Sequence, residues 1–166
     1  MNSPEGLSIG MGLDSHGLEP GGPLILGGIT IPFEKSLVGH SDGDVLLHAI
    51  MDALLSAADL PDLGEVFPGI DENRGRSSVD MAHEVARRVR EKGVEVLSID
   101  SVVLAEQPHI APLRMQLRES VAAALELDVH QVNVKGKTAD GFGPVGRGES
   151  IEAQAIALVR QAATEA

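Results

Sequence analysis

Three side chains that could share a metal ion lie in the first third of the chain. Asp14 and His16 are two residues apart on an expected strand, so their side chains leave the same face. His48 adds a second imidazole from the helix that follows. Two imidazoles and one carboxylate suit a zinc-type ion with one coordination position left open, which is typical of metal-assisted catalysis. The alternative is a strand end and a helix face that simply carry polar residues into solvent.

The segment between these ligands, residues 40–44 (His-Ser-Asp-Gly-Asp), is dense in polar chemistry. It places a third histidine beside a turn glycine at the start of a helix, where free N–H groups attract anions. Metal ligands next to such a helix start favour a phosphate-bearing substrate. Asp44 and Asp52 lie four residues before and after His48, so either carboxylate could orient its ring.

Two later segments could also contact a ligand. Residues 62–64 (Asp-Leu-Gly) could offer backbone N–H groups, with Gly64 allowing a close approach, although an ordinary turn is the simpler interpretation. Residues 137–148 combine a lysine, a hydroxyl, a carboxylate, several glycines and Arg147, which are components of a polyphosphate site. Their spacing is not that of a P-loop, and a surface loop is the alternative. His109, which follows Pro108, is a further candidate contact.

The composition limits both the fold and the chemistry. With 166 residues, 43% of them hydrophobic, the chain can form one domain over residues 1–166 with an aliphatic core, because only three phenylalanines represent the aromatic residues. Cysteine is absent from the sequence, so disulfides and thiol nucleophiles are excluded. Any metal must therefore be bound by histidine, carboxylate or backbone oxygen.

The charge balance is acidic, with 25 Asp and Glu against 13 Lys and Arg and a net charge of −12. Such a balance argues against nucleic acid as a partner, but local cations could still bind a small polyanion. The sequence has no apolar run approaching the ~20 residues of a membrane span, and residues 1–6 lack the features of a signal peptide. A cytoplasmic location, with neither membrane nor nucleic acid as a partner, is the expectation.

Hydrophobic periodicity indicates which elements position these residues. Strands are expected at 7–16, 94–105 and 131–137, with a hairpin at 24–31. Helices are expected at 44–58, 79–92 with Ser78 as N-cap, 113–125, and from Ser150 onward with Ile151, Ala155, Leu158, Val159 and Ala162 on one face. Residues 59–77 read as a long loop. Strands interleaved with helices predict an α+β fold, a single-domain α/β sandwich.

These motifs occur in an order that resembles one enzyme family. Asp-x-His at 14–16, a Gly-Gly hairpin running into Ile-Pro-Phe-Glu-Lys at 31–35, His-Ser-Asp-Gly-Asp-x-x-x-His at 40–48, Asp-x-Gly at 62–64 and Phe-Pro at 67–68 resemble 2-C-methyl-D-erythritol 2,4-cyclodiphosphate synthases. Val-Lys at 134–135, Thr138 and Gly-Arg-Gly-Glu at 146–149 fit the same family. The resemblance covers nearly the whole chain.

The resemblance implies an enzyme of non-mevalonate isoprenoid biosynthesis. Its substrate would be 4-diphosphocytidyl-2-C-methyl-D-erythritol 2-phosphate, whose 2-phosphate attacks the β-phosphate, closes a cyclic diphosphate and releases CMP. It further implies a mixed sheet with helices packed on one side, and a homotrimer whose sheets face the trimer axis and whose active sites lie between subunits. Two rivals remain open: another metal-dependent phosphohydrolase, which would use metal-bound hydroxide, and a non-catalytic trimer that binds metal or nucleotide.

The resemblance also implies roles for individual residues. Asp14, His16 and His48 would hold a zinc-type ion on the β-phosphate, and Asp140 would reach a second ion, Mg or Mn, that bridges the substrate phosphates. The implied catalytic residues are His40 and Thr138. The implied substrate contacts, besides Asp14, His16 and Asp140, are Ser41 with Asp62, Leu63 and Gly64 at the erythritol portion, Ala105, Pro108 and His109 at the cytidine diphosphate, and Arg147 at a phosphate or in the trimer channel.

The sequence departs from the family pattern at five of these motifs. Gly69 replaces an aspartate after Phe-Pro, His109 replaces a lysine, and Asp140 replaces a longer glutamate at the second ion. Pro144 and Leu13 stand where the family often has phenylalanine, which bears on any isoprenoid diphosphate in the trimer channel.

Overall fold

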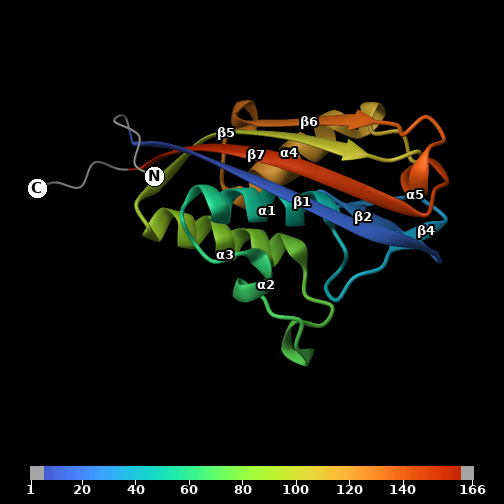
Figure 1. Cartoon of the computed structure of the whole chain (residues 1–166), viewed down its shortest axis with the longest axis horizontal. Helices are drawn as coiled ribbons and strands as arrows, with labels where there is room; N and C mark the ends of the chain where they lie inside the picture. Colours follow the sequence, from blue (N-terminus) through green and yellow to red (C-terminus); the bar gives the residue numbers. More distant parts are fainter. Residues whose placement is uncertain (1–5, 162–166) are drawn as a thin grey trace, which may run out of the picture.

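A five-stranded mixed sheet forms one layer of the protein, and the helices form the other (Figure 1). The computed structural model describes residues 6–161. The strands are β1 (Leu7–Pro20), β4 (Lys35–Leu37), β5 (Val94–Leu104), β6 (Val132–Lys137) and β7 (Ser150–Gln161), in the order β4-β1-β7-β5-β6. The pairs are antiparallel except β5 with β6, which is parallel. A separate hairpin joins β2 (Leu24–Leu26) to β3 (Ile29–Ile31).

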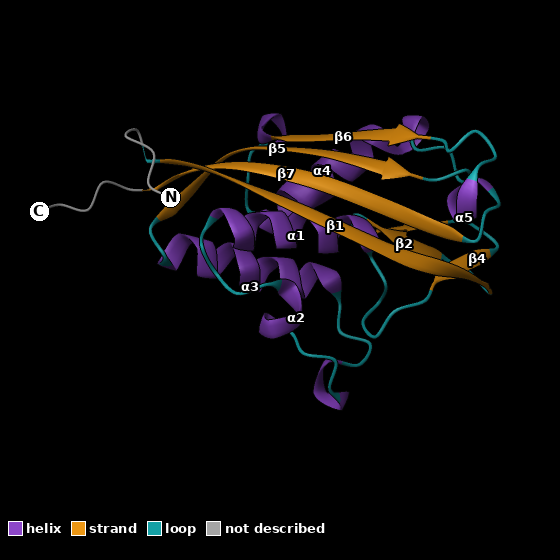
Figure 2. Cartoon of the chain, viewed as in Figure 1, coloured by secondary structure: helices purple, strands orange, loops and turns teal. Residues whose placement is uncertain are grey.

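The long helices α1 (Val45–Ala57), α3 (Ser78–Glu91) and α4 (Arg114–Leu125) pack on one face of this sheet, as Figure 2 shows in purple against orange. The short helix α2 (Leu63–Val66) contacts α1, and α5 (Gly143–Gly146) lies at the end of the sheet. Short 3₁₀ turns lie at Asp71–Asn73, Ala111–Leu113 and Val129–Gln131. The prediction of an α+β fold with a mixed sheet and helices on one side is confirmed. The described residues include no helix that is both long and apolar enough to cross a membrane.

Helix α1 lies at the centre of the core and is buried on nearly every side. It packs against β1, β7 and α3, and eleven of its thirteen residues are buried. Two glycines in β1 permit this close packing, because a Cβ at Gly10 would lie 2.0 Å from the Ala53 carbonyl oxygen and one at Gly12 would lie 2.0 Å from that of Ala49. Because Gly10 and Gly12 have no side chains, α1 can lie closer to β1 than any other residue at these positions would allow.

The prediction of a final helix from Ser150 is wrong, because this segment is the strand β7. It lies in the middle of the sheet, paired with β1 on one side and β5 on the other. The buried residues alternate, and they are Ile151, Ala153, Ala155, Ala157 and Val159. Alanine favours helices in isolation, but here its small side chain fits a strand that α1 covers closely. Ala162 lies outside the described residues.

The other predicted elements are present with shifted ends. Strand β1 continues from the expected end at His16 to Pro20, and β4 was not expected. The expected loop 59–77 contains the short helix α2 and a 3₁₀ turn. Helix α3 begins at Ser78 with Ser77 as its N-cap, one residue earlier than predicted. The 24–31 hairpin is confirmed.

Candidate metal centre and adjoining cavity

The three predicted ligands converge on one point between β1 and the start of α1. The Asp14 Oδ2 atom lies 2.8 Å from Nε2 of His16 and 3.0 Å from Nδ1 of His48. The two imidazole nitrogens are 3.2 Å apart. One donor atom from each residue lies within 4.8 Å of the others, so one ion could contact all three. The sequence expectation that these residues meet is confirmed by this geometry.

Strand alternation and helix packing bring the ligands together. Asp14 and His16 continue the face of β1 that Gly10 and Gly12 present to α1. Since these glycines let α1 lie close to β1, the first turn of the helix holds His48 directly beside Asp14. His48 is only 8% exposed, so the alternative of a solvated helix face is wrong.

The remaining ring nitrogens are occupied by protein partners, which leaves the converging nitrogens for a ligand. Nδ1 of His16 donates to the Val38 carbonyl oxygen at 2.5 Å. Nε2 of His48 lies 2.9 Å from the Ser78 hydroxyl and 3.1 Å from that of Ser41. Such outward partners fix the orientation of metal-binding histidines. With an ionised carboxylate beside two oriented imidazoles, the donor set fits a divalent zinc-type cation.

The charge state of the site is set by mutual hydrogen bonding. Burial opposes ionisation of Asp14, but its hydrogen bonds to His16 and His48, together with their positive charge, hold the pKa of this carboxyl well below its ordinary value. The hydrogen bond to Asp14 raises the pKa of His16 above its ordinary value, although partial burial opposes this. The Asp14 carboxylate is therefore negatively charged over the physiological pH range. A proton on Nε2 of His16 competes with a metal ion for that nitrogen.

The expectation that Asp44 or Asp52 orients the ring of His48 is wrong. The buried Asp44 carboxylate accepts from the backbone N–H groups of Gly27, Gly28 and Leu47, at 2.8, 2.6 and 3.0 Å. Burial raises the pKa of Asp44, although these three hydrogen bonds oppose the rise. Asp52 accepts from the backbone N–H of Leu63 at 3.2 Å. Both carboxylates therefore join backbone segments, and Asp44 ties the β2–β3 turn to the start of α1.

A cavity of about 220 Å³ opens beside the ligands. It is lined by seven of the predicted residues, namely Asp14, His16, His40, Ser41, His48, Leu63 and Gly64. Asp62 is the N-cap of α2, and its carboxylate accepts from the Glu65 backbone N–H at 2.9 Å. Asp62 therefore stabilises the start of the helix whose residues Leu63 and Gly64 line the cavity. His40 is anchored through Nε2 to the Ile70 carbonyl oxygen at 2.7 Å.

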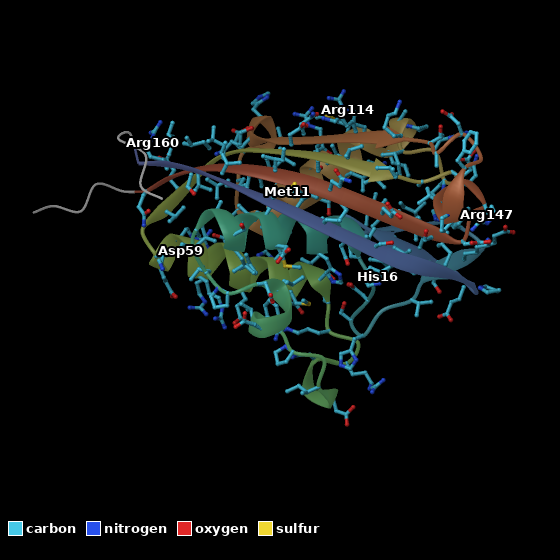
Figure 3. All side chains as sticks on the ribbon, viewed as in Figure 1. Met11, His16, Asp59, Arg114, Arg147 and Arg160 are labelled. Atoms are coloured by element: carbon cyan, nitrogen blue, oxygen red, sulfur yellow. The ribbon has the colours of Figure 1, made fainter. Side chains whose placement is uncertain are left out.

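The other predicted site residues lie elsewhere on the chain and do not line this cavity. They are Ala105, Pro108, His109, Thr138, Asp140 and Arg147. Thr138 donates to Asp140 at 2.9 Å, His109 faces Gln107 at 3.2 Å, and Arg147 pairs with Glu149 at 2.9 Å. Figure 3 shows Arg147 beside α5 at the end of the sheet, whereas His16 lies on β1. A single chain thus carries two separate groups of candidate residues.

Several residues of the site were not predicted to belong to it. Phe67, Gly69, Asn73 and Met81 line the cavity, although the sequence indicated Phe67 and Gly69 only as positions of a family motif, and Ser78 contacts His48. Ser78 was recognised only as a helix-capping candidate. No sequence spacing places it at the metal centre, because thirty residues separate it from His48.

The fold and the site together define an α+β protein in which three side chains that could hold one cation lie at the edge of a cavity. Residues 7–160 match the sequence profile of the YgbB family. The chain is 50% identical over 157 residues to the 2-C-methyl-D-erythritol 2,4-cyclodiphosphate synthase of Burkholderia mallei, covering 93% of this chain and 97% of that protein.

Two further comparisons extend this result. The chain is 51% identical over 154 residues to the bifunctional enzyme IspD/IspF of Albidiferax ferrireducens, covering 92% of this chain but only 37% of that longer protein. A solved structure of IspF from Plasmodium falciparum, a CDP complex, is similar with a TM-score of 0.83 and 30% identity, covering 96% of this chain and 99% of that one. The chain therefore belongs to the YgbB family, and the predicted membership is confirmed.

Proposed function

We propose that this chain converts 4-diphosphocytidyl-2-C-methyl-D-erythritol 2-phosphate to 2-C-methyl-D-erythritol 2,4-cyclodiphosphate with release of CMP. It acts as a phosphorus–oxygen lyase in non-mevalonate isoprenoid biosynthesis. The observation that carries the proposal is the Asp14, His16 and His48 cluster in a chain that matches the Burkholderia mallei synthase almost end to end. The CDP complex of the Plasmodium falciparum relative supports a cytidine-containing substrate.

The reaction needs no nucleophile from the protein, because the attacking 2-phosphate belongs to the substrate. What the protein must supply is orientation and positive charge where the phosphoryl group is transferred. A zinc-type ion held by Asp14, His16 and His48 would act as a Lewis acid on the β-phosphate. His40, Ser41, Leu63 and Gly64 line the cavity beside these ligands, and Asp62 caps the helix that carries Leu63 and Gly64. There these residues would orient the erythritol portion and stabilise the transition state.

The second group of candidate residues belongs, in this proposal, to the active site of a neighbouring subunit. Ala105, Pro108 and His109 bind the cytidine diphosphate there, and Arg147 binds a phosphate. Thr138 acts as the catalytic partner of His40, and Asp140 reaches an Mg or Mn ion that bridges the substrate phosphates. The separation of the two groups within one chain supports this arrangement. One domain spanning residues 1–166 and a cytoplasmic location are parts of the same proposal.

The exposed face of the sheet supports a homotrimer in which the sheets face the axis. On the side away from the helices, Ile9, Met11 and Leu13 of β1 are 68%, 67% and 58% exposed, and Ile156 of β7 is 50% exposed. Met11 and Ile156 are paired across β1 and β7, so the exposed apolar side chains of the two strands are neighbours on this face. A face of this kind indicates a surface that a partner covers.

The proposal is tested by incubating the protein with the cytidyl substrate and analysing the products by mass spectrometry. We expect CMP and a cyclic diphosphate in equal amounts, with the activity removed by a chelator and restored by zinc together with magnesium. CMP accompanied by an open-chain phosphate would refute the cyclase assignment and favour a metal-dependent phosphohydrolase. His83→Gln is a suitable control, since this histidine is exposed on α3.

A further inference from the structure

A hydrogen-bonded chain connects the candidate metal centre to the start of α3. It runs from Asp42, in the turn before α1, to the hydroxyl of Ser78, the first residue of α3, and on to Nε2 of His48. Ser78 is fully buried. Asp42 belongs to the 40–44 motif but does not line the cavity, so the proposed reaction leaves its presence unexplained.

The direction of each hydrogen bond follows from counting protons. The Asp42 carboxylate can only accept, and it takes the Ser78 backbone N–H on Oδ2 at 2.9 Å and the Ser78 hydroxyl proton on Oδ1. A weaker contact from the Asp44 backbone N–H, at 3.3 Å, further fixes Oδ1. A serine hydroxyl has one proton, so the Ser78 oxygen can offer only a lone pair to His48, 2.9 Å away. Nε2 of His48 must therefore carry the hydrogen.

From this chain we propose that Ser78 and Asp42 are positioning residues that keep a hydrogen on Nε2 of His48. The inference rests on the proposed metal site, because its consequence is that Nδ1, which contacts Asp14 and His16, is the nitrogen left to bind the ion. A neutral imidazole ligates only through its unprotonated nitrogen. Replacing a residue that orients a metal-binding histidine in this way typically lowers metal affinity about 10- to 100-fold.

Ser41 is the competing partner, and the structure separates its role from that of Ser78. Its hydroxyl lies 3.1 Å from the same Nε2, and it also accepts a long hydrogen bond of 3.5 Å from the Gly43 backbone N–H. No carboxylate takes its proton among the described contacts. Ser41 also lines the cavity, whereas Ser78 does not. Since Ser78 already accepts from Nε2–H, the Ser41 hydroxyl is left to turn toward a substrate.

Asp42→Asn is the sharpest test because it keeps the shape and reverses the hydrogen bonding. The single amide oxygen of asparagine must accept the Ser78 backbone N–H, which turns the amide NH₂ toward the Ser78 hydroxyl oxygen. The Ser78 proton then points at Nε2 of His48 and favours the Nδ1–H tautomer, which blocks the metal position. Ser78→Ala removes the acceptor altogether. Ser77→Ala is the matched control, since Ser77 caps the same helix but contacts the Asp80 backbone N–H.

Two readouts are needed, with folding checked by circular dichroism. Nitrogen-15 NMR of histidine in the metal-free protein reports the tautomer of the His48 ring, and competition with a chromogenic chelator reports zinc affinity. We expect Nε2–H in the wild type and in Ser77→Ala, a shift to Nδ1–H in Asp42→Asn, and zinc binding weakened about 10- to 100-fold in Asp42→Asn and Ser78→Ala.

Wild-type tautomer and affinity in both Asp42→Asn and Ser78→Ala would overturn the inference, as would an equal loss caused by Ser41→Ala alone. A wild-type protein that binds no zinc would instead refute the proposed metal site. The tautomer measurement in the metal-free protein tests the role of Ser78 independently of that outcome.

Discussion

The competition between a proton and a metal ion at His16 makes a quantitative prediction for thermal stability. The pKa of His16 is raised by its hydrogen bond to Asp14, and that of Asp14 is held well below its ordinary value. Nε2 of His16 lies 2.8 Å from Asp14 Oδ2 and 3.2 Å from His48 Nδ1, so a proton on this nitrogen lies where the ion would bind. Below the raised pKa of His16, a metal ion must therefore displace one proton, and its affinity falls about tenfold per pH unit.

The sign of the pH effect is opposite in the metal-free and metal-bound proteins. A raised folded-state pKa means that protonated His16 stabilises the metal-free fold below the ordinary value of 6.5, and that this contribution is lost as the pH rises through the raised value. Each tenfold gain in zinc affinity adds about 1.4 kcal/mol at saturating zinc. For a chain of this size that corresponds to about 3 to 6 °C in Tm per pH unit.

The assay is differential scanning fluorimetry of chelator-treated protein with and without excess zinc, across mildly acidic to neutral pH. The zinc-induced rise in Tm should increase steadily with pH in the wild type. His83→Gln, which changes an exposed histidine outside the site, should reproduce the same increase. His16→Gln should show a smaller rise that depends less steeply on pH, because the proton on His16 no longer competes with zinc. A wild-type rise that is equal at every pH would refute the reasoning.

Three other predictions concern the ligands, the shared site and the packing of α1. His48→Ala should lose zinc and more than about 100-fold in turnover while keeping a folded circular dichroism spectrum, and normal turnover would remove His48 from the ligand set. Mixing His16→Ala and Thr138→Ala chains should restore activity at up to about one quarter of the sites, by random assembly of complementary subunits; no recovery would place both groups in one subunit. Gly12→Ala should lower the free energy of unfolding by about 3 kcal/mol or more in urea titrations, because its Cβ would lie 2.0 Å from a backbone oxygen of α1. Gly17→Ala, whose Cβ meets its first neighbour at 3.9 Å, is the control, and an equal loss there would contradict the packing argument.

The sequence was sufficient to predict that Asp14, His16 and His48 lie together, because each is on an element with a clear hydrophobic period. Asp14 and His16 occupy alternate positions of a strand, and His48 lies in a strongly hydrophobic helix. The burial of His48 could not be foreseen, because it depends on α1 being covered by β1 on one side and α3 on another. The role of Asp44 could not be foreseen either, because its carboxylate accepts hydrogen bonds from the backbone of the β2–β3 turn.

The main error in the fold, the final strand β7, has a physical cause. An alternation of Ala153, Ala155 and Ala157 with polar or exposed residues is compatible with both a strand and a helix, and alanine alone favours the helix. Only the neighbouring strands β1 and β5, with α1 above them, decide the outcome. Ser78 escaped prediction for a similar reason, since a tertiary contact brings it to His48.

In the proposed reaction the nucleophile is the phosphate of the substrate. An ion at Asp14, His16 and His48 would stabilise negative charge on the transferred phosphoryl group and would not activate water. This assignment of the nucleophile is tested most directly by running the reaction in water enriched in oxygen-18 and weighing the products by mass spectrometry. We expect a cyclic diphosphate and CMP that contain no oxygen-18. Incorporation of oxygen-18 into either product during turnover would show that water attacks, and the substrate phosphate would then not be the nucleophile.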